Sequence, residues 1–211
     1  MKIRKIGHSC MYIQEAGLKI LIDPGMFTTA QNELTGLDIM LITHEHADHC
    51  DINSIKEILK NNPKLKIFTN TSVKNILAKE GIEAIILEDG QSHAHEGVLF
   101  HAFGDQHAMF HPTLPVFQNT GYMIGNRFYY PGDSFAKPDR PVEILALPVG
   151  GPWMKTMEAI DFAFDLKPKV VFPVHDMVYA NPAMTHRWPA MALEKAGIKF
   201  ISLENDGEIE V

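Results

Sequence analysis

The 211-residue sequence contains little cysteine, few basic residues and no long hydrophobic run. Its two cysteines, Cys10 and Cys50, are too few for the disulfide framework of a small secreted protein. No apolar stretch approaches the ~20 residues of a membrane-spanning helix, and the apolar run at the N-terminus is too short for a signal peptide. We therefore expect a cytoplasmic protein with reduced thiols.

The scarcity of basic residues also narrows the range of partners. The formal net charge is −7, whereas nucleic acids and anionic membrane surfaces attract basic faces. We therefore expect neither nucleic acid nor membrane as a partner, and a small molecule as substrate. The composition, 45% hydrophobic and 21% charged, is typical of globular proteins, and the length fits one domain better than two. We expect residues 1–211 to form a single domain.

What the sequence does contain is three histidines and an aspartate within six positions, directly after the apolar run Ile39-Met40-Leu41-Ile42. In an extended backbone alternate side chains share one side, so His44, His46 and Asp48 converge. His49 points elsewhere, which suits a second centre beside the first. Neutral imidazole and carboxylate are ligands of zinc, iron and manganese. This clustering predicts a metal site rather than a solvated polar loop.

The spacing of apolar and turn residues predicts two successive mixed sheets, one from each half of the chain. Alternation of strands and helices between residues 39 and 87 implies parallel pairing, with helices over one face. Helices are expected at about 51–60, 71–79, 156–166 and 184–196, started at the first two by Asp51 or Asn53 and by Thr71 or Ser72. Strands are expected at 3–6, 10–13, 18–22, 39–42, 65–69, 84–87, 92–96, 98–103, 117–124, 127–131, 144–147, 170–172, 198–203 and 208–211.

Three polar residues at the ends of later strands offer further ligands. His107 follows the strand at 98–103, Asp133 follows the apolar Tyr129-Tyr130, and His175 follows the apolar run 170–174. Functional sites often form where strands deliver side chains to loops. Together with the first four groups these make seven, enough for two metals that share one carboxylate.

Two other histidines compete with His107 for its role. His101 alternates within a predicted strand, and His111 lies farther into the following loop, so we rank both below His107. His93, His95 and His186 belong to no recognisable motif.

The order of these residues resembles the metallo-β-lactamase fold superfamily, from Gly7-His8-Ser9 to Phe172-Pro173-Val174-His175. It looks most like the lactonase-like and uncharacterised metal-dependent hydrolase branch, in which Gly-His-Ser opens the chain and Gly-Asp-Ser/Thr carries a bridging aspartate. The resemblance implies an α+β fold of four αββα layers. It also implies two divalent metal ions, zinc first, with manganese or iron as alternatives.

Carried over residue by residue, the resemblance implies three ligands for each metal and one shared ligand. The first metal would be held by His44, His46 and His107, and the second by Asp48, His49 and His175. Asp133 would bridge the two. Asp48 is also the expected catalytic residue, because its carboxylate can accept a hydrogen bond from the nucleophile, a hydroxide bridging the two metals. His8 is expected near the site, either as a contact to substrate or ligand or as a turn residue. Asp23 is expected to orient a ligand histidine.

The resemblance implies a metal-dependent hydrolase that cleaves an ester, lactone, amide or phosphoester bond. One alternative is a di-iron redox enzyme on the same scaffold, although such relatives usually add a flavin domain for which this length leaves no room. Another is a non-catalytic metal-binding module, against which the complete ligand set argues. The segments 148–153 and 176–178 depart from the lactonase-like pattern, so no relative's substrate is carried over.

Substrate specificity is expected in the segments 104–116, 148–156 and 176–186. An exposed apolar loop there favours a homo-oligomer, and basic residues near the motifs are limited to Lys137, Arg140 and Lys155, which disfavours a multiply phosphorylated substrate. Seven apolar residues are candidates for an apolar entrance, with core packing the favoured role for some of them: Met26, Phe27, Met109, Phe110, Phe117, Trp153 and Met154.

Overall fold

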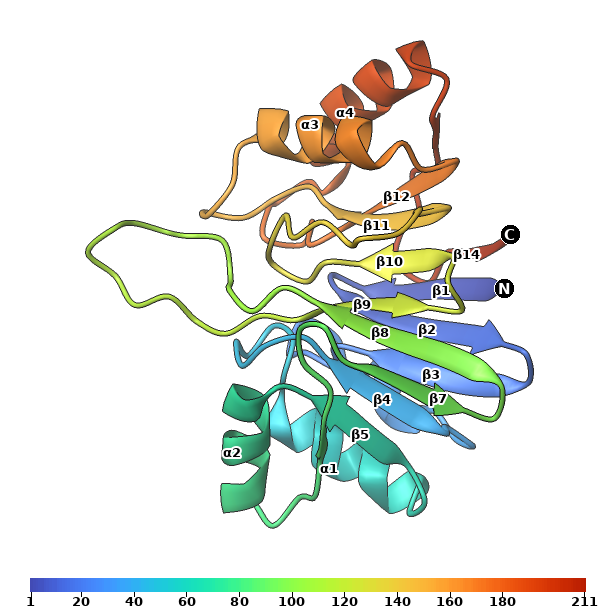
Figure 1. Ribbon diagram of the computed structural model, residues 1–211, viewed down its shortest axis with the longest axis vertical. Helices are drawn as coiled ribbons and strands as arrows, with labels where there is room; N and C mark the ends of the chain where they lie inside the picture. The colour runs from blue at the N-terminus through green and yellow to red at the C-terminus, as the bar shows by residue number, and fades with distance from the viewer.

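The computed structural model describes residues 1–211 and consists of two seven-stranded mixed sheets packed face to face, with helices on both outer faces (Figure 1). The first sheet has the order β14-β1-β2-β3-β4-β5-β6, and the strands β3 to β6 are parallel. Its strands are β1 (Lys2–Gly7), β2 (Cys10–Glu15), β3 (Leu18–Ile22), β4 (Ile39–Ile42), β5 (Lys66–Thr69), β6 (Ile85–Ile86) and β14 (Glu208–Glu210).

The second sheet has the order β13-β12-β11-β10-β9-β8-β7, and the strands β10 to β13 are parallel. Its strands are β7 (Ser92–His95), β8 (Val98–Phe103), β9 (Gly121–Ile124), β10 (Phe128–Tyr130), β11 (Ile144–Pro148), β12 (Val170–Val174) and β13 (Lys199–Phe200). The helices are α1 (Ile52–Asn61) and α2 (Thr71–Lys79) on the first sheet, and α3 (Thr156–Leu166) and α4 (Ala183–Lys195) on the second.

Three apolar clusters fill the three interfaces between these four layers. β4 illustrates the pattern, since Ile39 and Leu41 lie in the cluster between the sheets while Met40 and Ile42 lie in the cluster under α1 and α2. Alternate residues of a strand face opposite sides, so a strand buried on both faces is apolar throughout. The expected four-layer αββα sandwich is confirmed.

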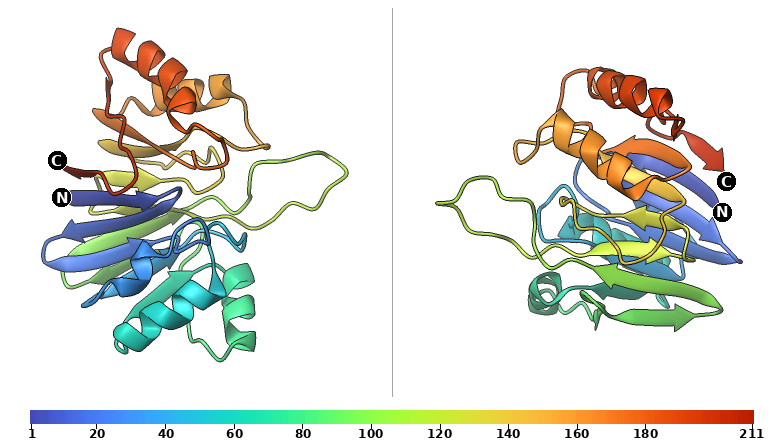
Figure 2. Two further views of the ribbon diagram at one scale, coloured as in Figure 1. Left: turned by 180° about the vertical axis from the view of Figure 1, so that it is seen from behind. Right: turned by 45° about the horizontal axis from the view of Figure 1, so that its top comes forward.

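The last strand departs from the expected division into two halves. β14 leaves the C-terminal half and pairs antiparallel with β1, where Ile3 lies opposite Ile209, so the two chain ends lie side by side (Figure 2). Because this pairing joins the two ends of the chain, no local pattern of residues near β14 indicates it. β14 is therefore an edge strand of the first sheet, next to β1.

Some element boundaries differ from expectation, and others agree with it. The expected strand 117–124 begins only at Gly121, because Thr120 instead donates its backbone N–H to the carbonyl of Thr43 (2.9 Å). Asp51 caps α1 as expected, and α2 begins at Thr71 as expected. The cap of α2 is Asn70, whose side chain accepts from Val73 N (3.1 Å). The segment 26–37 contains a short 3-10 helix, η1 (Ala30–Glu33).

The parallel strands position the candidate site. β4, β10 and β12 end at one side of the sandwich, where each delivers polar residues to the loop that follows it (Figure 1). The long segment between β8 and β9 projects from the same side in all three views (Figures 1 and 2). None of the helices has both the length and the apolar character needed to cross a membrane.

Candidate metal centre

All seven predicted ligand residues converge at this side of the sandwich, in two groups. Within each group the candidate ligand atoms lie within 4.8 Å of one another. Most of these side chains are buried, while those of His46 and Asp48 are partly exposed. One group is His44, His46, His107 and Asp133; the other is His8, Asp48, His49 and His175.

Asp133 lies between the two groups. Its Oδ2 is 3.4 Å from His107 Nε2 in one group and 2.9 Å from His175 Nε2 in the other, and its Oδ1 is 3.3 Å from His49 Nε2. Burial would raise the pKa of this carboxyl, but His175 and His49 hold that pKa well below its usual range. A buried carboxylate in contact with both groups is suited to bridge two cations.

Nearby carboxylates also shift the pKa of two histidines of the site, His175 and His49. Burial alone would lower the pKa of the His175 imidazole, but the Asp133 carboxylate beside it raises that pKa to about 9. The pKa of His49 is likewise raised, against the effect of burial, by Asp133 and Asp23. The arrangement therefore favours positive charge at the positions that the carboxylates face.

The unpaired polar atoms of the site show that these residues fit metal ions. His49 Nε2, His107 Nε2, Asp133 Oδ1 and both ring nitrogens of His175 are buried and make no hydrogen bond, although the three Nε2 atoms lie 2.9–3.4 Å from oxygens of Asp133. Such an atom costs about 1–3 kcal/mol, so a cluster of them is rare unless something else satisfies them. Divalent metal ions accept this set of imidazole nitrogens and carboxylate oxygens.

Hydrogen bonds behind the cluster hold three of the rings with Nε2 toward it. His49 Nδ1 donates to Asp23 Oδ2 (2.7 Å), and His107 Nδ1 donates to the carbonyl of Ala108 (2.6 Å). His44 Nδ1 donates to Thr43 Oγ1 (3.0 Å), whose own proton goes to Asp23 Oδ2 (2.7 Å). A donated Nδ1 proton leaves the Nε2 lone pair free to ligate. Asp23 thus makes the contact expected of a residue that orients a ligand.

Two glycines let the loops come close enough to form the cluster. A Cβ on Gly25 would overlap the carbonyl of Asp48, and a Cβ on Gly132, where φ is +66°, would overlap the side chain of Asn119. The amide of Asn119 in turn accepts from the backbone N–H of Asp133 (3.0 Å). Backbone approach of this kind is available only to residues without a Cβ.

The rival histidines lie outside both groups. His101 lies on β8, where its Nε2 is 3.0 Å from Asn126 Oδ1, and His111 is exposed in the projecting segment. His8 belongs to the second group, with Nε2 3.2 Å from Asp48 Oδ2. The sequence allowed two interpretations of His8, a contact to substrate or ligand and a turn residue.

Sequence reasoning missed a buried charged network behind His175. Asp176 Oδ2 accepts from Lys5 Nζ (2.5 Å) and lies 2.8 Å from His186 Nε2, and the Lys5 side chain is fully buried. The only available signal was a lysine at the alternate position to Lys2 and Arg4 in the strand Lys2–Gly7, and nothing in the sequence connects it to Asp176.

Aromatic rings border the cluster. Ring centroids lie 4.5 Å apart for Phe117 and His46, 4.9 Å for Phe110 and His107, and 4.5 Å for Phe27 and His8. Trp153 lies 5.6 Å from His107 and 5.7 Å from His175, so it contacts one histidine of each group. Of the other expected entrance residues, Met26 and Met109 are exposed, while Met154 packs against the core under α3 and α4.

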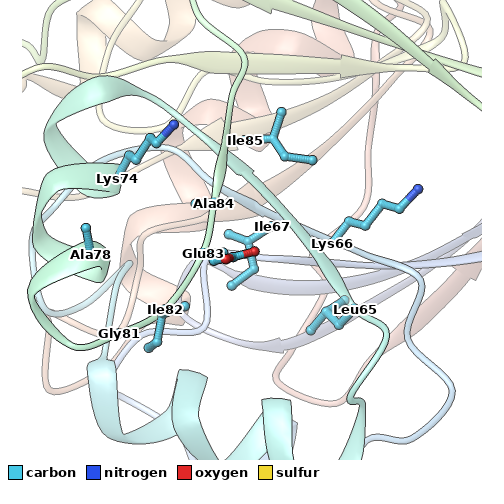
Figure 3. Close-up of a pocket in the computed structure, with 10 residues that line it drawn as sticks. All are labelled: Leu65, Lys66, Ile67, Lys74, Ala78, Gly81, Ile82, Glu83, Ala84 and Ile85. Carbon is cyan, nitrogen blue, oxygen red and sulfur yellow. The ribbon is translucent and has the colours of Figure 1, made fainter.

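Two cavities lie away from the cluster itself. One of about 610 Å³, between α2 and the strands β5 and β6, is lined mainly by apolar residues with Lys66, Lys74 and Glu83, and contains no histidine (Figure 3). The other, of about 400 Å³, lies where the segment after β12 meets α4 and is lined by Val149, Thr156, Tyr179, Ala180, Asn181, Met184, Thr185 and Trp188.

Fold and site together define a metallo-β-lactamase fold protein with a candidate metal centre at the strand ends. The family model of the beta-lactamase superfamily domain matches residues 2–175, and the chain belongs to this superfamily.

Relatives and solved structures agree with this membership. The chain is 33% identical to Protein Rv0786c of Mycobacterium tuberculosis over 87% of each chain. It is 28% identical to UPF0173 metal-dependent hydrolase Ta0764 of Thermoplasma acidophilum over 91% of each. Among solved structures, Igni18, a metallo hydrolase of Ignicoccus hospitalis, has a TM-score of 0.76 at 24% identity, covering 100% of this chain and 98% of that one.

Proposed function

We propose that the protein is a metal-dependent hydrolase whose two metal ions, zinc first, are held by the two groups, with residues 1–211 acting as one domain. The observation that carries the proposal is the position of Asp133, in contact with histidines of both groups. The family membership and the relatives named as metal-dependent hydrolases support it. Both cysteines are buried and unpaired, which agrees with a cytoplasmic location.

In this proposal His44, His46 and His107 would hold one ion, Asp48, His49 and His175 would hold the other, and both groups would share Asp133. Divalent ions supply a nucleophile at neutral pH, by lowering the pKa of water, and polarise the bond to be cut. The protein residues then need to orient that nucleophile and exclude other water.

Asp48 is the residue placed to orient the nucleophile. It is the carboxylate of the cluster with solvent access, since 22% of its side chain is exposed against 3% for Asp133. Burial would raise the pKa of Asp48, but His175 and His8 hold it below its ordinary value, so the group stays an ionised acceptor. An ionised carboxylate accepts a hydrogen bond from an attacking water or hydroxide, and so fixes its direction.

The walls of the site favour a substrate with an apolar portion. Phe27, Phe110, Phe117 and Trp153 border the cluster. The ion pairs of Asp48 and Asp133 are all with histidines, and none is with a lysine or arginine. Lys137 pairs with Asp165 and Arg140 with Asp139, both on the surface. We therefore propose a carboxylic ester or lactone with an apolar group, in preference to a phosphomonoester, whose two negative charges would meet no basic side chain.

A panel of substrates tests the proposal. Metal-free protein would be loaded with zinc, manganese or iron and assayed on aryl esters, lactones, phosphodiesters and phosphomonoesters, with His44→Ala as the blank. We expect metal-dependent hydrolysis, fastest on an apolar ester or lactone. The proposal fails if no metal form cleaves any member of the panel, or if His44→Ala cleaves as fast as the wild type.

A further inference from the structure

His8 occupies a constrained position beside the second group of the site. It lies in the turn between β1 and β2 with φ +50°, and its side chain is almost fully buried. Its ring centroid is 4.2 Å from that of His175 and 4.5 Å from that of Phe27, and its carbonyl accepts from the backbone N–H of His175 (3.2 Å). A left-handed conformation at a residue other than glycine is strained, and such strain often accompanies a functional constraint.

The backbone of Met177 determines which ring nitrogen of His8 carries the proton. The N–H of Met177 donates to His8 Nδ1 at 3.2 Å, so Nδ1 presents its lone pair. A protonated ring would place a hydrogen on Nδ1 and meet that N–H head-on. The ring is therefore neutral, with its single proton on Nε2.

This tautomer gives His8 a different role from that of the other histidines in its group. His8 Nε2 lies 3.2 Å from Asp48 Oδ2, so its proton is donated to that carboxylate oxygen. A ligand imidazole needs the opposite arrangement, a lone pair on the nitrogen that faces the metal. His49 has that arrangement, because it donates Nδ1–H to Asp23 and keeps Nε2 free.

We propose that His8 is a positioning residue rather than a metal ligand, with Nε2–H fixing the Asp48 carboxylate and Nδ1 tying it to the backbone of Met177. The inference rests on the proposed function, in which Asp48 both ligates and orients the nucleophile. With Oδ2 held by His8, the carboxylate cannot rotate freely about its terminal bond. The same pair of hydrogen bonds connects Asp48 to the start of the segment 177–182, beside the apolar cavity under Tyr179.

Two amide substitutions separate the positioning role from a merely structural one. In His8→Gln the side-chain NH₂ reaches the position of Nε2 and can still donate to Asp48, whereas in His8→Asn it reaches only the position of Nδ1. Asparagine, however, tolerates the left-handed backbone better than glutamine. The donor role therefore predicts that Gln outperforms Asn, and a role in the turn alone predicts the reverse.

The experiment measures metal content, kcat and KM for the zinc-loaded wild type, His8→Gln, His8→Asn and His8→Ala. We expect two zinc ions per chain in all four, kcat lower by about 10–100-fold in His8→Asn and His8→Ala, as for other residues that orient ligands, and kcat largely restored in His8→Gln. Loss of one zinc ion per chain in both His8→Ala and His8→Gln would make His8 a ligand. Equal or better activity of His8→Asn than of His8→Gln would also overturn the proposal.

A readout independent of activity is the tautomer itself. ¹⁵N NMR of histidine-labelled, zinc-loaded protein, assigned with His8→Gln, should show the pattern of a neutral ring protonated at Nε2. A His8 signal with the proton on Nδ1 would refute the inference even in a fully active enzyme. If instead the wild type binds two zinc ions and shows the expected tautomer but hydrolyses nothing, the proposed function fails and the assignment of His8 stands.

Discussion

Replacing Asp133 with asparagine is expected to lower kcat/KM by at least about 10³-fold, beyond the ~10–100-fold typical of residues that only orient ligands. Asp133 faces His107 in one group and His49 and His175 in the other. An amide has nearly the same shape but no negative charge, so in the proposed centre it would leave two cations close together without a shared counter-charge. The measurement is kcat/KM with the metal content of the same sample.

The matched control for this variant is Asp165→Asn, which makes the same chemical change at an exposed residue paired with Lys137. Exposed ion pairs contribute about 0–1 kcal/mol, so this control should keep wild-type activity and metal content. A zinc-loaded Asp133→Asn protein with two ions per chain and more than a tenth of wild-type activity would show that Asp133 is not the bridge.

Replacing Lys5 with methionine is expected to lower the free energy of unfolding by about 3–5 kcal/mol, the usual cost of removing one partner of a buried ion pair. Lys5 Nζ lies 2.5 Å from Asp176 Oδ2, and both side chains are almost fully buried. Burial lowers the pKa of the Lys5 ammonium, and the nearby Asp176 carboxylate opposes that effect. Without Lys5, the carboxylate next to His175 keeps only His186 as a partner.

Urea denaturation of metal-free protein measures this effect. Lys56→Met serves as the control, because Lys56 forms an exposed pair with Glu80 and its loss should cost less than about 1 kcal/mol. The double variant Lys5→Met/Asp176→Leu should be more stable than Lys5→Met alone, since it removes the isolated charge as well. A Lys5→Met protein as stable as Lys56→Met would mean that the buried pair contributes nothing.

The part of the fold that sequence reasoning anticipated is the part with local signals. The histidine cluster begins at His44, two residues after the apolar strand Ile39–Ile42, so one short stretch of sequence contains both. The helix after Asp51 has both its cap and its apolar spacing within a few residues. The four-layer architecture came from resemblance to a family, because the pairing of two sheets depends on contacts that no local pattern encodes.

The most consequential features that sequence reasoning missed are contacts between distant parts of the chain. β14 pairs with β1 across the whole length of the sequence, and the fully buried Lys5 reaches Asp176 from another sheet. The interpretation of His8 stayed divided because its tautomer depends on a backbone N–H of Met177, 169 positions away. A sequence identifies which residue types can act as ligands, but the atoms that face each ring nitrogen are defined only in three dimensions.

Anomalous X-ray diffraction at the zinc edge, from crystals of zinc-loaded protein, decides whether two metal ions share Asp133. We expect two peaks per chain about 3.5–4 Å apart. One peak should lie among His44, His46 and His107, the other beside Asp48, His49 and His175, with Asp133 between them. A single peak, or peaks outside these two groups, would show that Asp133 is not shared by two ions.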